Sequence, residues 1–119
     1  MVHVTLGIND WIRVTRLISI ENERIETEAE LHGNLDDDAV YKEMLANLNI
    51  TAKILTDMST NNNGIEAIVE LSILEVKVLA HLLNGVLSLC NDSGDSVIME
   101  IAHIANTFGA AIVNYYEPM

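Results

Sequence analysis

The sequence contains little cysteine, aromatic residue or positive charge. Its single cysteine, Cys90, cannot form an internal disulfide, which favours a reducing compartment. Aromatic residues make up only 4% of the chain, so the core must be built from aliphatic side chains. Six lysines and arginines would release too few counterions for sequence-independent binding to DNA or RNA. We therefore expect no nucleic-acid partner.

Acidic and apolar residues, by contrast, are both abundant. Eighteen acids give a net charge of −12 in 119 residues, while half of the residues are hydrophobic. Disorder requires low hydrophobicity together with high charge, so we expect one folded domain over residues 1–119. The N-terminus lacks the pattern of a signal peptide, and the uncharged run 78–91 is too short to cross a bilayer. These features predict a cytoplasmic protein that does not contact membranes.

Residues 1–33 are predicted to form an antiparallel β-meander. Residues 24–32 alternate polar and less polar side chains, the period expected of a strand. A preceding strand is indicated by branched residues at even positions, namely Ile12, Val14, Ile18 and Ile20. The segment 21–23 suits a tight turn between these two strands, and residues 2–6 supply a third strand.

Three helices are predicted to follow the meander, which makes the fold class α+β. A helix over 35–59 is indicated by three aspartates suited to its first turn and by an apolar stripe at helical spacing. The stripe consists of Val40, Met44, Leu48, Ala52 and Leu55. Residues 65–116 are predicted to form a long antiparallel helical hairpin, with one helix over about 65–90 and a turn at 91–95.

The first helix of this hairpin predicts a homo-oligomer. It is apolar on nearly all sides, and 26 helical residues span about 39 Å. A compact domain of this length has a radius of gyration of only about 13–14 Å. One hairpin partner and a small sheet would leave such a helix partly uncovered. A monomer with helix 35–59 laid across the hairpin is the alternative.

The hairpin corner carries the most specific residues in the chain. Leu79-Ala80-His81-Leu82-Leu83 leads through Leu87-Ser88-Leu89-Cys90 into Asn91-Asp92-Ser93-Gly94-Asp95, and Phe108-Gly109-Ala110-Ala111-Ile112 follows one helix later. This pattern resembles the helical-hairpin domain of phage-encoded signal sponges, the Thoeris anti-defence and anti-CBASS proteins. The resemblance covers about 50 residues of the 119. The sequence departs from the family where Asn91 replaces a proline and where Gly94 replaces a basic residue.

The resemblance implies a non-enzymatic homo-oligomer that sequesters a cyclic nucleotide immune signal, a cyclic ADP-ribose isomer or a cyclic oligonucleotide, in the host cytoplasm. The residues themselves partly agree, because Asn91 and Ser93 lie in a turn that opens a helix, where N–H groups can hold a phosphate. Asn106 and Phe108 could hold a base or ribose, but only across a subunit interface. The alternative is that Phe108 is a core residue and Asn106 a surface residue.

Three arginines are candidates to hold an anionic ligand against the negative charge of the protein. Arg16 falls on the predicted core face of its strand, where a guanidinium needs an acid or a bound phosphate, unless it extends outward to solvent. Arg13 and Arg24 are the other two, with pairing to acids across strands as the alternative.

Two other classes of function compete with the sponge. Residues 21–43 carry nine acids, and this acidic segment could imitate nucleic acid and occupy a basic protein partner. Glu100 and His103 have the spacing of a di-iron bundle, with His81 and Asn84 opposite them, but the further carboxylates of such a site are missing. No nucleophile with an activating base is recognisable, so we expect no catalytic residue, metal or cofactor.

Overall fold

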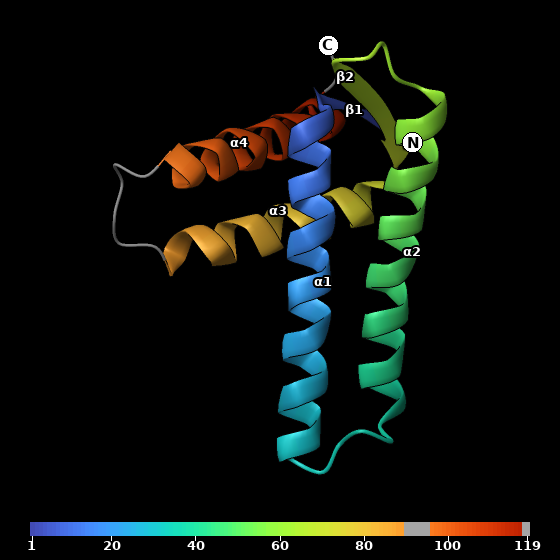
Figure 1. Cartoon of the computed structure of the whole chain (residues 1–119), viewed down its shortest axis with the longest axis vertical. Coiled ribbons are helices and arrows are strands. Elements are labelled where there is room, and N and C mark those ends of the chain that lie inside the picture. Colours follow the sequence, from blue (N-terminus) through green and yellow to red (C-terminus); the bar gives the residue numbers. More distant parts are fainter. Residues whose placement is uncertain (90–95, 118–119) are drawn as a thin grey trace.

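The computed structural model describes residues 1–89 and 96–117 (Figure 1). Over these ranges the chain is α+β, with a two-stranded antiparallel sheet and four helices instead of the predicted three. The elements in chain order are β1 (Val2–Gly7), α1 (Ile8–Leu31), α2 (Asp38–Thr60), β2 (Glu66–Leu71), α3 (Ile73–Ser88) and α4 (Ser96–Tyr116).

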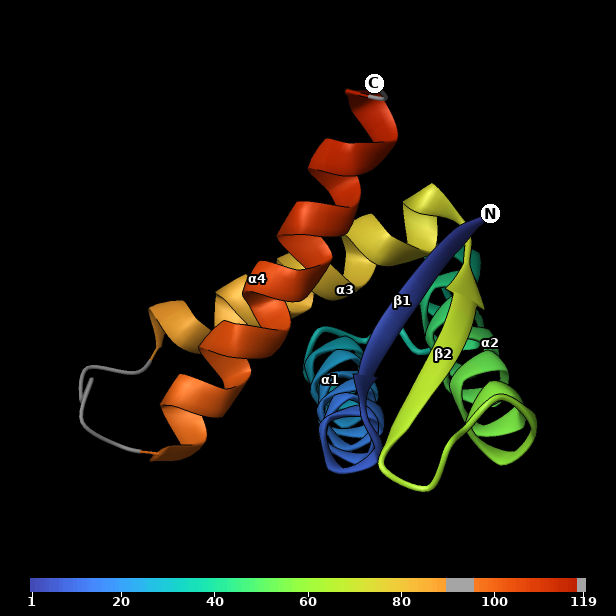
Figure 2. The same cartoon turned by 90° about the horizontal axis from the view of Figure 1, so that it is seen from above.

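The sheet joins the N-terminus to the middle of the chain. β1 and β2 pair from Val2 opposite Leu71 to Gly7 opposite Glu66. Alternate residues of β2 are buried while those between them are exposed, as expected for a sheet with one covered face. Seen from above, the two strands lie across the ends of α1 and α2 (Figure 2). α3 begins beside α2, where Lys53 pairs with Glu75, and runs past α1, and most of α4 lies on the other side of α1 from α2 (Figure 1).

The predicted meander over 1–33 is wrong beyond its first strand. The predicted strand 2–6 is confirmed as β1, but residues 8–31 form α1, and the expected turn 21–23 lies within that helix. Residues buried along α1 recur every three or four positions, at Trp11, Val14, Ile18, Asn22, Ile25 and Ala29. This spacing is the helical period. The segment forms a helix and not a strand because a helix turns all of these residues toward the core.

The predicted helix 65–90 is in fact a strand followed by a shorter helix. Residues 66–71 form β2, and α3 begins at Ile73 after the N-cap residue Ser72. The Ser72 hydroxyl accepts a hydrogen bond from the Glu75 backbone, and the Glu75 carboxylate accepts one from the Ser72 backbone. This reciprocal capping box fixes the start of α3 and leaves the residues before it free to join the sheet.

The other predicted helices are present. α2 matches the prediction for 35–59, and its N-cap Asp37 accepts a hydrogen bond from Ala39. α3 and α4 pack together as the predicted hairpin, although α3 has only 16 residues. By length and composition α4 could cross a membrane, but a single such helix is weak evidence, and its Ile104 and Phe108 are fully buried in the core.

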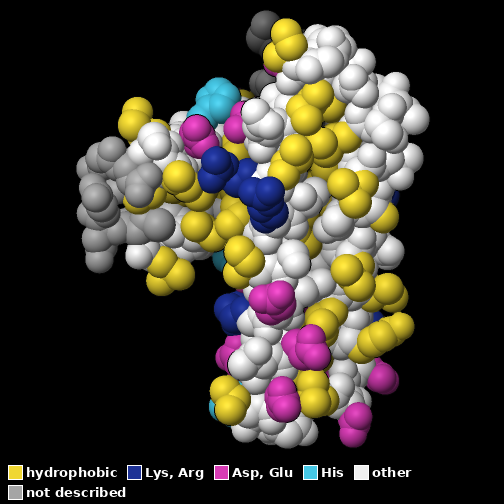
Figure 3. All heavy atoms as spheres, viewed as in Figure 1, with side chains coloured by type: hydrophobic (Ala, Val, Ile, Leu, Met, Phe, Trp, Pro, Cys, Tyr) yellow, Lys and Arg dark blue, Asp and Glu magenta, His cyan; other side chains and the backbone are white. Residues whose placement is uncertain are grey.

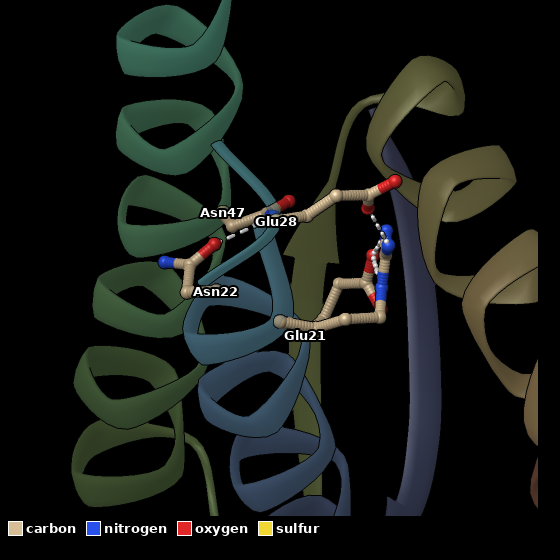
Figure 4. A network of polar contacts seen from close by, with 5 residues as sticks. Glu21, Asn22, Glu28 and Asn47 are labelled. Carbon is tan, nitrogen blue, oxygen red and sulfur yellow. Dashed lines mark hydrogen bonds and ion pairs between the residues drawn. The ribbon is translucent and has the colours of Figure 1, made fainter. Parts of the chain in front are cut away.

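α1 and α2 form a second helical pair that projects away from the sheet (Figure 1). A buried polar contact joins them, since Asn47 donates a hydrogen bond of 2.8 Å to the side-chain oxygen of Asn22 (Figure 4). Asn22 in turn donates to the backbone oxygen of Met44 at 3.2 Å. Both asparagines are 8% exposed, so each depends on the other for hydrogen bonding.

The predicted apolar stripe of α2 lies largely outside the core. The α2 residues that are buried are Asn47, Ile50 and Ile54. Leu48 and Leu55, which belong to the stripe, are 56% and 54% exposed. This part of the stripe thus faces away from α1, whereas Val40 and Met44, at its start, are half-buried.

Candidate functional site

A groove of about 990 Å³ lies between the first half of α1 and the first half of α4. Successive turns of α1 contribute Asn9, Arg13 and Arg16 to its lining, and α4 contributes Glu100 and His103. The positions 13 and 16 fall on one helical face because α1 replaces the predicted strand. The start of α1, with the positive end of the helix dipole, lines the same groove.

The two arginines in the groove differ in how far they are neutralised. Arg13 forms an ion pair of 2.5 Å with Glu100, and its Nε is buried without a hydrogen-bond partner. Arg16 is exposed, and it has no ion pair or hydrogen bond with any residue that the structure describes. Figure 3 shows basic side chains gathered over this part of α1, beside acidic and histidine side chains. The groove therefore offers one free guanidinium and one that is partly engaged.

Arg24 lies elsewhere, eight residues further along α1 from Arg16, or about 12 Å along the helix axis. Its guanidinium pairs with Glu21 at 2.5 Å and with Glu28 at 2.6 Å (Figure 4). The hydrogen bond with Glu21 and the nearby negative charges raise the pKa of Arg24 above its usual range, although burial lowers it. The alternative that Arg24 pairs with acids thus holds, but along one helix instead of across strands.

Of the remaining predicted site residues, the two that the structure describes, Asn106 and Phe108, do not join the groove. Phe108 is completely buried, with its ring centroid 5.9 Å from that of Trp11 in an edge-to-face contact, so it is a core residue in this structure. Asn106 is exposed on α4 but does not line the groove. Asn91 and Ser93 lie outside the described residues. The structure therefore brings together two of the seven predicted ligand residues, Arg13 and Arg16.

The residues considered for a metal site are only partly brought together, because Glu100 and His103 line the groove and His81 does not. Among the described residues, no three histidine, cysteine or acidic side chains are grouped to hold a metal ion. Glu100 is engaged by Arg13, and His81 lines a different pocket, between α3 and the α1–α2 pair.

Sequence reasoning missed Asn9 and Asp10, and it considered Glu100 and His103 only for a metal site. Asn9 and Asp10 belong to the first turn of α1, and His103 faces them from α4. The spacing of Arg13 and Arg16 could have indicated one basic helical face, had residues 8–31 been recognised as a helix.

No protein-family model, no curated protein and no solved structure matches this chain. Its function must therefore be inferred from the site itself.

Proposed function

We propose that the protein binds a small phosphorylated molecule in the α1–α4 groove and sequesters it without converting it. The observation that carries this proposal is Arg16, an exposed guanidinium left unpaired by the described residues of a chain with a charge of −12. In so acidic a protein, a free arginine beside a second arginine is a local attraction for an anion. A cyclic nucleotide immune signal is the ligand class that the resemblance of the hairpin corner implies.

The size and lining of the groove support a nucleotide-sized ligand. A volume of about 990 Å³ lies within the range of small-molecule sites. Ile12 and Ile20 from α1 supply apolar surface for a base or a ribose face, while Arg16 supplies paired donors for a phosphate. Asp10 and Glu100 oppose anion binding, so Arg16 and the start of α1 must hold the phosphate.

Sequestration is favoured over catalysis by the groups in the groove. Among the described residues that line it, there is no serine, threonine, cysteine, lysine or tyrosine that could act as an activated nucleophile. The carboxylate of Glu100 is bound to Arg13, which leaves it poorly placed to act as a general base.

The proposal is tested by incubating the full chain with cyclic ADP-ribose isomers and with cyclic oligonucleotides. After removal of free ligand, the protein is heated and the supernatant is analysed by chromatography. We expect one ligand class to be recovered intact. Recovery of a converted product would contradict sequestration, and retention of no ligand would contradict the proposed function.

Calorimetry on three variants then locates the site. Arg16→Ala should weaken binding about ten- to hundredfold, the loss expected for charge-assisted hydrogen bonds. Arg24→Ala removes the same charge outside the groove and serves as the matched control, with affinity expected to stay within about twofold of the parent protein. Glu100→Gln frees Arg13 and should strengthen binding. Equal losses in Arg16→Ala and Arg24→Ala would show that net charge, and not this groove, determines binding.

A second candidate function rests on the acidic segment. Eight of the nine acids in residues 21–43 are exposed, and they surround the end of the α1–α2 pair that is remote from the sheet (Figure 3). Such an acidic tip fits a protein that occupies a basic partner. Polylysine is a suitable probe: salt-labile binding that is lost in Asp36→Asn/Asp37→Asn/Asp38→Asn, with no nucleotide retained, would favour this candidate.

A further inference from the structure

The outer face of α2 carries a continuous apolar stripe that the single chain leaves exposed. Its members follow the alternating spacing of four and three residues that is typical of coiled coils. They are Tyr41, Leu45, Leu48, Ala52 and Leu55, followed by Ser59. Their large side chains are exposed by 65% at Tyr41 and by 41%, 56% and 54% at the three leucines. Hydrophobic side chains are visible along α2 in Figure 3.

We propose that this stripe pairs with the same stripe of a second copy of the chain. The two α2 helices are antiparallel, around a two-fold axis that passes the outer face of α2 between Leu48 and Ala52, at the level of residue 50. Successive members of the stripe are four, three, four, three and four residues apart, and this series is the same from either end. An antiparallel pair centred on position 50 therefore aligns every member of one stripe with a member of the other. Because the stripe advances on average about 3.5 residues per turn, supercoiling of the two helices keeps both stripes in contact along their length.

The sizes of the aligned side chains are complementary in this register. Leu48 meets Ala52 of the second copy, Tyr41 meets Ser59, and Leu45 meets Leu55. Large residues thus face small ones or a residue of equal size, which lets the two helices interdigitate. A parallel pair would instead place tyrosine on tyrosine at one end and serine on serine at the other.

The flanks of the stripe contain almost no charge, although the protein is strongly acidic. One flank consists of Lys42, Asn49 and Thr56, and the other of Met44, Thr51 and Met58. The antiparallel register places Lys42 opposite Thr56 of the second copy and brings no two acids together. Two copies that each carry −12 can therefore approach through this face without direct repulsion.

The stripe is long enough for a specific but weak interface. From residue 41 to 59 it runs for about 27 Å. Pairing would bury on the order of 1,000 Å² in total, the lower limit for a specific interface. Because α2 is already folded against α1, no helix has to form on association. We expect a dimer that dissociates on dilution through the micromolar range.

This dimer surface is distinct from the proposed ligand groove. α2 lies on one side of α1, whereas α4 and the groove lie on the other (Figures 1 and 2). It is also distinct from the hairpin, on which the sequence analysis placed self-association. The inference therefore does not depend on the proposed function, and each can fail without the other.

Sedimentation velocity of the full chain over a wide concentration range tests the proposal. The parent protein should pass from monomer to dimer, whereas Leu48→Glu should raise the dissociation constant at least about tenfold, because it introduces two charges at the centre of the seam. Leu74→Glu, at a position 69% exposed on α3, is the matched control and should leave the dimer unchanged. Leu48 is exposed in the monomer, so both variants should keep the circular dichroism of the parent protein.

Cross-linking in a Cys90→Ser background tests the register. Asn49→Cys lies beside the two-fold axis and should form a disulfide-linked dimer on oxidation. Tyr41→Cys lies at the end of the stripe, far from its counterpart in an antiparallel pair, and should not. A protein that stays monomeric at all concentrations would overturn the proposal. Dissociation by Leu74→Glu but not by Leu48→Glu, or cross-linking through Tyr41→Cys, would overturn it as well.

Discussion

The buried asparagine pair between α1 and α2 yields a prediction whose magnitude follows from its hydrogen bonds. Asn22→Leu removes the acceptor of the Asn47 amide and leaves that amide without a partner at a position 8% exposed. We expect a cost of about 2–3 kcal/mol, the upper part of the range for an unsatisfied buried polar group. Asn47→Leu should cost less, about 1–2 kcal/mol, because Asn22 keeps its hydrogen bond to Met44.

The double variant Asn22→Leu/Asn47→Leu should recover most of this loss, because leucine has a shape close to that of asparagine and leaves no polar group unpaired. Its unfolding free energy should lie within about 1 kcal/mol of the parent protein, which implies a coupling of at least about 2 kcal/mol. Urea unfolding, followed by circular dichroism at one fixed protein concentration, measures the parent protein, the two single variants and the double variant. Additive losses in the double variant would refute this reasoning.

Three other stability predictions can be measured by the same urea unfolding. Trp11→Phe should cost about 2–4 kcal/mol, because the Trp11 indole is fully buried and donates a hydrogen bond of 2.9 Å to the Ala67 carbonyl; a loss below 1 kcal/mol would contradict this. Gly64→Ala should destabilise by about 1 kcal/mol because of its φ of +91°, whereas Gly85→Ala, in open space on α3, should stabilise by up to about 1 kcal/mol. Burial raises the pKa of Glu75, but hydrogen bonds outweigh burial and hold this pKa below its usual value. The ionised Glu75 therefore stabilises the fold above about pH 4.3, and this stabilisation disappears as the pH falls through the folded-state pKa. In Glu75→Gln the free energy of unfolding should fall less steeply as the pH is lowered. An unchanged pH dependence would be inconsistent with this role of Glu75.

The error over residues 8–31 shows why a periodic pattern alone could not determine the fold. Ile12 and Ile20 suggested an alternating strand, yet both are exposed, while Trp11, which lies outside that pattern, is fully buried. The branched residues favour a strand locally, and packing of the helical face on the sheet and α4 outweighs that preference. For the same reason, the alternative that Arg24 pairs with acids holds along one helix and not across strands, since its partners lie three and four residues away.

Other parts of the structure were accessible from the sequence. The aspartates at the start of α2 and its apolar stripe indicated that helix, which runs over Asp38–Thr60 where 35–59 was predicted. The start of α3 was also recognisable, because Ser72 and Glu75 have the spacing of a capping box, but the apolar run around them concealed it. The groove was not predictable, because it forms only when the first turns of α1 meet α4, about 90 residues further along the chain.

The distribution of charge explains how an acidic chain can carry so much apolar surface. The acids of residues 21–43 lie around one end of the α1–α2 pair, where they repel other copies at long range. The stripe on α2 has a single charge on its flanks, Lys42, so an approach along that face meets little direct repulsion. An apolar surface scattered over the molecule would associate in many orientations. In the proposed dimer the charge would disfavour orientations that bring the acidic ends together, and the antiparallel α2 contact would avoid them, so association would be specific as well as weak.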